Sequence, residues 1–355
     1  KLIELIENDL SQFQSPPQLS MPLPDIWIVK SLLQKAIRRN DLAQALRATQ
    51  FAIELDRKSF WRRLPIIAWE DVGIADINLC NSVCMLARSK RLRSKIGHEW
   101  LVASYLVTKL CAAPKDRSSD DLLTVIEHDQ DLKPARDRLA FAESEEREAL
   151  LNGGSGPLQY RAIALHYALG TDRLRSDLLH RKSADGEHLS ILQSIAGCPF
   201  DLANICADST KRTGTILPAF SAMLWRGWIG QQTGKSSQSD DFGHQYEIAS
   251  IPRYAFDGNT RTGRKYLHWL ASIDDGLSHY LKSNVPKPIR RPLVRKLYFR
   301  LKSSLCANRE YWSDGCDLRH RADQIGYGLP TDAIDEGKRL LAIAMLQYPM
   351  AEEHL

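Results

Sequence analysis

Three carboxylates lie within the segment EDVGIAD at positions 70–76. Glu70, Asp71 and Asp76 are close enough in sequence to bind a metal ion or to act as an acid–base pair. The same spacing is also typical of a turn between two helices, in which Gly73 takes the bend and Asp76 caps the following helix. We favour the structural turn, formed by Glu70, Asp71, Gly73 and Asp76, and we expect no metal there.

A second group of reactive residue types lies at 251–265, in the sequence IPRYAFDGNTRTGRK. Backbone amides at the start of the expected helix, together with Arg261, Arg264 and Lys265, could hold a phosphate group. Two alternatives remain open. In one, the stretch is a plain turn in which Asp257 pairs with a neighbouring arginine and the threonines cap the helix. In the other, Asp257 is catalytic.

Lysines and arginines cluster at 38–39, 62–63, 88–95 and 282–302. The last cluster holds eight cations and no acid, together with aromatic residues that could stack on bases. One such cluster is usually a solvated face, but four fit a surface that follows a phosphate backbone. The predicted nucleic-acid contacts are Arg38, Arg39, Arg62, Arg63, Arg91, Arg93, Lys95, Arg261, Arg264, Lys265, Arg290, Arg291, Arg295 and Lys296.

No motif for nucleotide hydrolysis or another known chemistry is complete. The nearest approach to a phosphate-binding loop, GQQTGKS at 230–236, is one residue short of the required spacing. Cys80 and Cys84 are four residues apart on a probable helix, without a second pair to complete a zinc site. The sequence therefore predicts no catalytic residue, no metal and no cofactor.

The composition is that of an ordinary globular protein. The chain has 355 residues, 43% of them hydrophobic and 26% charged, and a net charge of +5. Because this charge is small, a nucleic-acid argument depends on local clustering. Seven cysteines without paired spacing indicate a reducing compartment, and no apolar run is long enough to span a membrane. We expect a cytoplasmic, nucleoid-associated or nuclear protein.

Helical periodicity dominates the pattern. Apolar residues recur at three- and four-residue spacing in 26–37 and again in 42–53, with a break at Asn40 and Asp41. This predicts an antiparallel helical hairpin within a mostly α, multi-helix array. We expect a short helix and a proline-rich linker at 1–25, a helical domain at 26–151, and a second helical domain at 157–355 with the basic segment 282–302.

Residues 26–129 resemble the helical region behind the ATPase core of the RarA/MgsA/WRNIP group, which are clamp-loader-like AAA+ proteins of replication and recombination. The resemblance rests on the basic run ending at Arg39, an alanine-rich second helix, the Arg62–Arg63 step, AWEDVGIAD at 68–76 and the end of a helix at 103–115. Trp69, Ile77 and Asp116 depart from that pattern. The resemblance does not extend to the ATPase. It implies a clamp-loader-collar-like fold, DNA engagement and self-association.

These observations predict a non-catalytic protein of DNA replication, recombination or repair. It would bind DNA and form a homo-oligomer, or act as the partner of a separately encoded AAA+ ATPase. The first alternative is an enzyme that acts on nucleic acid or a phosphorylated substrate through 251–265. The second is a protein-interaction scaffold without nucleic-acid contacts.

Overall fold

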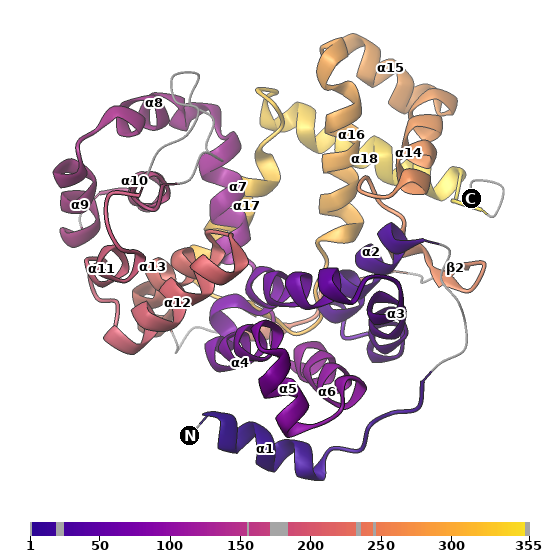
Figure 1. The fold of residues 1–355 in the computed structure, drawn as a ribbon. Helices are drawn as coiled ribbons and strands as arrows, with labels where there is room; N and C mark the ends of the chain where they lie inside the picture. The colour runs from indigo at the N-terminus through magenta and orange to yellow at the C-terminus, as the bar shows by residue number, and fades with distance from the viewer. Residues whose placement is uncertain are drawn as a thin grey trace.

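The computed structural model describes residues 2–18, 25–154, 156–170, 184–231, 236–243 and 246–351. It shows a mostly helical protein, as the periodicity predicts (Figure 1). The elements are α1 (Leu2–Gln12), α2 (Ile26–Arg38), α3 (Leu42–Ile67), α4 (Ile77–Arg88), α5 (Lys90–Ile96), α6 (Glu99–Ala112), α7 (Ser118–His128), α8 (Lys133–Phe141), α9 (Ser144–Asn152), α10 (Leu158–Ala168), α11 (His188–Gln193), α12 (Phe200–Thr213), α13 (Leu217–Gly230), β1 (Ser236–Gln238), β2 (Glu247–Ile248), β3 (Ile251–Pro252), α14 (Arg261–Ile273), α15 (Asp275–Asn284), α16 (Arg290–Tyr298), β4 (Arg309–Tyr311), α17 (Ser313–Gln324) and α18 (Thr331–Gln347).

The predicted hairpin is formed by α2 and α3, which pack against each other along their length. Asp25 caps α2 by accepting hydrogen bonds from the amides of Trp27 at 2.7 Å and Ile28 at 2.9 Å. Asp41 caps α3 in the same way. Within α3 the backbone leaves helical geometry at Asp56, so the basic step Arg62–Arg63 lies on its second half.

The acidic turn has the structure that its sequence predicts. A π-helical turn (Ala68–Val72) leads into a short 3₁₀ helix (Gly73–Asp76), and Gly73 bends the chain with a φ of 51°. A Cβ atom at Gly73 would lie 2.9 Å from the backbone oxygen of Asp116, so the turn requires glycine. Asp76 caps α4 by accepting from the amide of Leu79 at 2.9 Å.

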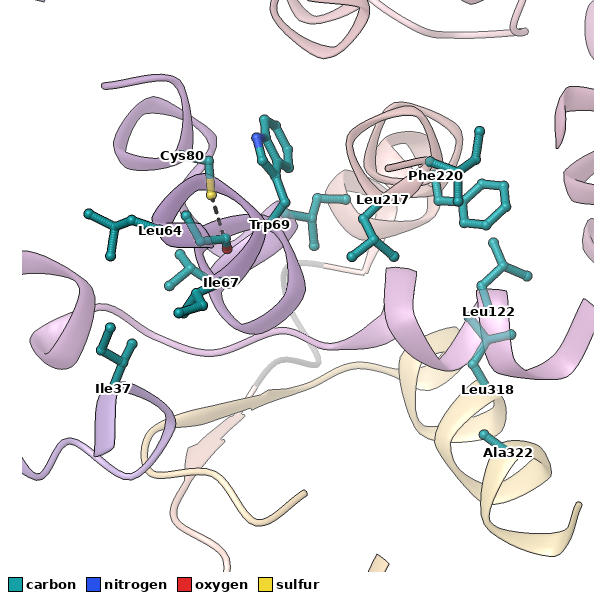
Figure 2. Close-up of a cluster of buried hydrophobic side chains, with 14 of the residues drawn as sticks. Ile37, Leu64, Ile67, Trp69, Cys80, Leu122, Leu217, Phe220, Leu318 and Ala322 are labelled. Carbon is teal, nitrogen blue, oxygen red and sulfur yellow. Dashed lines mark hydrogen bonds between the residues drawn. The ribbon is translucent and has the colours of Figure 1, made fainter. Parts of the chain in front are cut away.

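Figure 2 shows that helices far apart in the sequence share one core. Trp69 and Cys80 are fully buried at the centre of the N-terminal helices, and the Cys80 thiol donates to the Ala68 carbonyl at 3.4 Å. Phe220 on α13 and Leu318 on α17 belong to the same core. The two cysteines on α4 therefore lie in the core, as their helical spacing indicates.

The expected boundary at 152–157 does not separate two cores. In Figure 1, α17 lies beside α7, and α13 packs against α7 and against the 3₁₀ turn at 73–76. Lys115 also forms a β-bridge with Arg309, and β1 pairs antiparallel with β4. The glycine-rich segment is therefore a connection within one packed array, because the second half of the chain folds back over the first.

Two side chains on the polar side of α2, Lys35 and Arg38, are buried against Asp257 and Ser303 of the second half. The basic segment 282–302 is largely helical, made of the end of α15, all of α16 and a π turn (Phe299–Ser303). None of the helices in the described ranges is long and apolar enough to cross a membrane.

Candidate functional site

Two adjoining cavities, of about 560 and 320 Å³, form a groove between the first helical hairpin and α16. We call it the basic groove. The cavities share Asn259 and Phe299, so the loop before α14 and the end of α16 lie where they meet. The larger is lined by α2, α3 and the acidic turn, and the smaller by α7, α16 and Tyr327. Its cationic lining residues are Lys30, Lys35, Arg38, Arg62, Arg63, Arg295, Lys296 and Arg300.

The groove has a buried ionic floor. Asp71 is fully buried and accepts from Arg38 at 2.7 Å and from Arg117. Glu70 accepts from the same two arginines, at 3.2 and 3.3 Å. Burial alone would raise the pKa of Glu70, but the neighbouring arginines outweigh it and lower the pKa to about 2. Glu70 is therefore ionised, and both acids are paired with arginines inside the protein.

Arg38 is consequently not a phosphate contact, contrary to the sequence prediction. The residue is 1% exposed, and its guanidinium also donates to the backbone carbonyl of Ser303. The arginine joins α2, the acidic turn and the end of α16. The prediction failed because the residue that covers Arg38 lies more than two hundred positions away in the sequence.

Asp257 is paired as well, but with a lysine and not with the neighbouring arginine that the turn interpretation named. Lys35 Nζ lies 2.8 Å from the Asp257 carboxylate, and both side chains are nearly inaccessible. Burial lowers the pKa of Lys35 to about 8, although Asp257 opposes the effect. Asp257 also accepts from the amide of Asn259 at 2.8 Å. These contacts fix the 257–259 loop on α2, and the carboxylate is fully engaged.

The start of α14 is closed by its own cap. The Thr260 hydroxyl accepts from the amide of Gly263 at 3.0 Å, so this amide does not face a ligand. A Cβ atom at Gly263 would lie 2.1 Å from the backbone oxygen of Asp257, which shows how closely the loop and the helix pack. The threonine cap of the plain-turn alternative is therefore present. One of the amides expected to face a phosphate, that of Gly263, is thus occupied by a side chain.

Cations from two distant segments meet beside the groove. Helix α14, which carries Arg261, Arg264 and Lys265, packs against α16, which carries Arg290, Arg291, Arg295 and Lys296. Burial lowers the pKa of His268 on α14, and the charges of Arg291, Arg295 and Arg264 lower it further. Burial and the nearby Arg300 lower the pKa of Lys296 to about 7. The structure therefore joins the predicted clusters at 261–265 and 290–296 into one positive surface.

A third cavity adjoins the basic groove. It has a volume of about 700 Å³, lies among α3, α4, α5 and α12, and shares Arg62 with the basic groove. We call it the α5 cavity. Its described lining has one carboxylate, Glu99, and seven cationic side chains: Arg57, Lys58, Arg62, Arg88, Lys90, Arg93 and Arg212. Arg62 is exposed at the edge common to both cavities.

Three further predicted contacts have structural roles. Arg39 is 8% exposed and stacks between two aromatic rings. Arg93 is equally buried, lies 4.0 Å from the ring centroid of Trp61 and donates to two carbonyls near the end of α4. Arg290 donates to carbonyls around the end of α15. The predicted residues Arg91, Lys95, Arg261, Arg264, Lys265 and Arg291 are exposed, and Arg63, Arg295 and Lys296 are half-buried in the groove.

Two aromatic side chains in the groove, Trp27 and Tyr327, are not among the residues predicted from the sequence. Trp27 is 64% exposed and lines the larger cavity, with Lys30 Nζ 5.2 Å from its ring centroid. Tyr327 is 41% exposed and lines the smaller cavity, with Lys296 Nζ 5.8 Å from its ring. A tryptophan three residues before a lysine on a helix was the available signal for the first. Nothing local marked Tyr327.

In comparisons with known proteins, no protein-family model, curated protein or solved structure matches the chain. Among the described residues, no group of three or more His, Cys, Asp or Glu side chains is placed to hold a metal ion.

Proposed function

We propose that this protein binds DNA, with a single strand lying in the basic groove. One observation carries the proposal. Half-buried and exposed cations line two adjoining cavities, and each cavity also has an exposed aromatic ring, Trp27 in the larger and Tyr327 in the smaller. Basic side chains that follow the backbone and rings that stack on bases are the usual means of binding single strands.

The electrostatics of the groove support an anionic ligand. Its two lining carboxylates, Glu70 and Asp257, are held by internal arginines and by Lys35. Arg62 and Arg295 therefore contribute a positive field that these acids do not cancel, and Lys296 adds to it when it is protonated. The α5 cavity continues the same field beyond Arg62. A surface of this kind attracts a polyanion over a longer path than one cavity provides.

The resemblance of residues 26–129 to the RarA/MgsA/WRNIP group supports a role in replication, recombination or repair. On this proposal the chain is a non-catalytic component that self-associates or works with a separate AAA+ ATPase. An enzyme acting through 251–265 is the weaker proposal, because Asp257 is engaged by Lys35 and Thr260 caps the helix. A scaffold without DNA contacts remains the other alternative to test.

Fluorescence anisotropy with single-stranded, duplex and forked DNA at two salt concentrations tests the proposal. We expect binding that weakens steeply with salt and is tightest for substrates with a single-stranded part. Binding should not require magnesium. Absence of binding at low salt would refute DNA binding and favour the scaffold. Magnesium-dependent turnover of the DNA, lost in Asp257→Ala, would favour the enzyme.

A further inference from the structure

A separate cavity of about 380 Å³ lies near the end of α2, between α16 and the end of α18. We call it the aromatic cavity. Its lining combines four aromatic rings with three cations and several aliphatic side chains. The residues that matter here are Arg39, Phe242, Tyr246, Arg253, Tyr254, Tyr298, Lys302 and Leu346. Among its described lining residues there is no carboxylate.

Two of the rings are held in place by hydrogen bonds. The Tyr254 hydroxyl donates to Asp41 at 2.6 Å, and the Tyr298 hydroxyl donates to the carbonyl of Phe256 at 3.1 Å. With their hydroxyls bonded to the protein, both side chains line the cavity in one orientation. This part of the cavity wall is therefore built in advance of any ligand, which reduces the entropy cost of binding.

The cations are also placed by the fold. The Arg39 guanidinium carbon is 4.7 Å from the ring centroids of both Phe242 and Tyr254, and Arg39 Nη2 donates to the Lys302 carbonyl at 2.5 Å. Arg253 donates to the Tyr266 hydroxyl at 3.2 Å. Arg39 thus lies between two rings at the wall of the cavity and adds a positive charge there.

These cations act on one another. Burial lowers the pKa of Lys302, and the charges of Arg253 and Arg39 lower it further, while Asp241 opposes them. Three positive groups therefore share one partly buried space, although each repels the others. A bound anion would remove that repulsion, since it would neutralise charge where solvent is excluded.

The opening of the cavity offers additional apolar surface. Tyr246 is 56% exposed and Leu346 is 83% exposed, and both line the cavity. A planar ligand that enters can therefore stack on Tyr246 while its charged end reaches Arg253 and Lys302. A volume of about 380 Å³ lies within the usual range for small-ligand sites.

We propose that the aromatic cavity binds a nucleotide, with the base among the aromatic rings and the phosphate held by Arg253 and Lys302. The aromatic rings provide stacking surfaces for a flat base, and the cations provide positive charge for the phosphate attached to it. The nucleotide is either a free mononucleotide or the phosphorylated end of a strand. This proposal stands independently of the basic groove, because the two sites have no lining residue in common within the part of the chain that the structure describes.

Isothermal titration calorimetry with AMP, adenosine and inorganic phosphate tests the ligand chemistry. We expect AMP to bind with one site per chain and at least tenfold more tightly than adenosine or phosphate. Tyr246→Ala and Lys302→Gln should each weaken AMP binding at least fivefold, because they remove a stacking surface and a charge. Their thermal unfolding should match that of the parent protein, since Tyr246 is exposed and Lys302 is half-buried.

Two further measurements distinguish a free mononucleotide from a strand end, and binding at the aromatic cavity from binding at the basic groove. A 5′-phosphorylated trinucleotide that binds at least tenfold more tightly than AMP, and loses this affinity in Tyr246→Ala, identifies a strand end. AMP binding should be unchanged when Arg62, Arg63 and Arg295 of the basic groove are replaced. The proposal is overturned if neither AMP nor the trinucleotide binds, or if their binding is unaffected by both cavity variants.

Discussion

Replacement of Arg62, Arg63 and Arg295 together by glutamine should weaken single-stranded DNA binding without unfolding the protein. Arg62 is exposed, and the other two are half-buried in the groove. Arg63 is 39% exposed and its ion pair with Glu70 is long, at 4.0 Å. Arg38 and Arg117 continue to neutralise Glu70 in the variant. The three changes therefore remove charge from the groove and leave its ionic floor in place.

The expected loss in DNA affinity can be calculated from counterion release. Each phosphate contact with a single strand contributes about 0.7 to the slope of log K against log salt concentration. Loss of three contacts should lower the slope by about 2. At 0.1 M salt this corresponds to a loss in affinity of about 130-fold, or ~3 kcal/mol, if the contacts are purely electrostatic.

The assay is fluorescence anisotropy with a labelled oligonucleotide over a range of salt concentrations, together with circular dichroism to confirm the fold. Lys109→Gln is the matched control, because Lys109 is an exposed lysine on α6 that lines none of the cavities described above. The control should lose little affinity. A triple variant that is folded and keeps the parent slope would refute the assignment of the strand to the basic groove.

Three other perturbations test particular residues. DNA affinity should rise as the pH falls from 8 to 6, because burial lowers the pKa of Lys296 to about 7 and the lysine gains its charge in this range. The variant Lys296→Arg is charged throughout this range and should show a smaller rise in the same titration. Trp27→Ala should weaken single-strand binding by about 1–3 kcal/mol with little change in the salt slope, because it removes a stacking surface but no charge; an unchanged affinity would exclude Trp27 from the interface. Gly73→Ala should destabilise the fold by about 2 kcal/mol or more in urea unfolding, since alanine disfavours a φ of 51° and its Cβ would press on the Asp116 carbonyl; parent-like stability would show that the turn can adapt.

Local sequence signals predicted much of the fold. The apolar spacing in α2 and α3 gave the hairpin, and Asp76 and Gly73 marked the cap and the turn. These features depend on neighbours within a few residues, and such interactions are the same wherever the segment is placed. The basic clusters at 62–63 and 290–296 also gave part of the candidate groove.

The identity of the exposed cations required the tertiary structure. Arg38 and Arg62 look alike in sequence, yet Arg38 is buried against Asp71 while Arg62 faces solvent. The difference arises because the segment after α16 covers the end of α2. The same limit applies to the domain boundary expected at 152–157, because a glycine-rich composition does not reveal what the chain packs against on either side.

The sequence by itself determined the helices, their caps and the positions of the charges. Only the tertiary structure decided which charges are neutralised inside and which remain outside. It set Trp27 and Tyr327 along one groove and gathered Arg39, Arg253 and Lys302 in one cavity. The physical reason is that helix formation depends on contacts close in sequence, whereas burial and charge pairing depend on contacts between residues up to hundreds of positions apart.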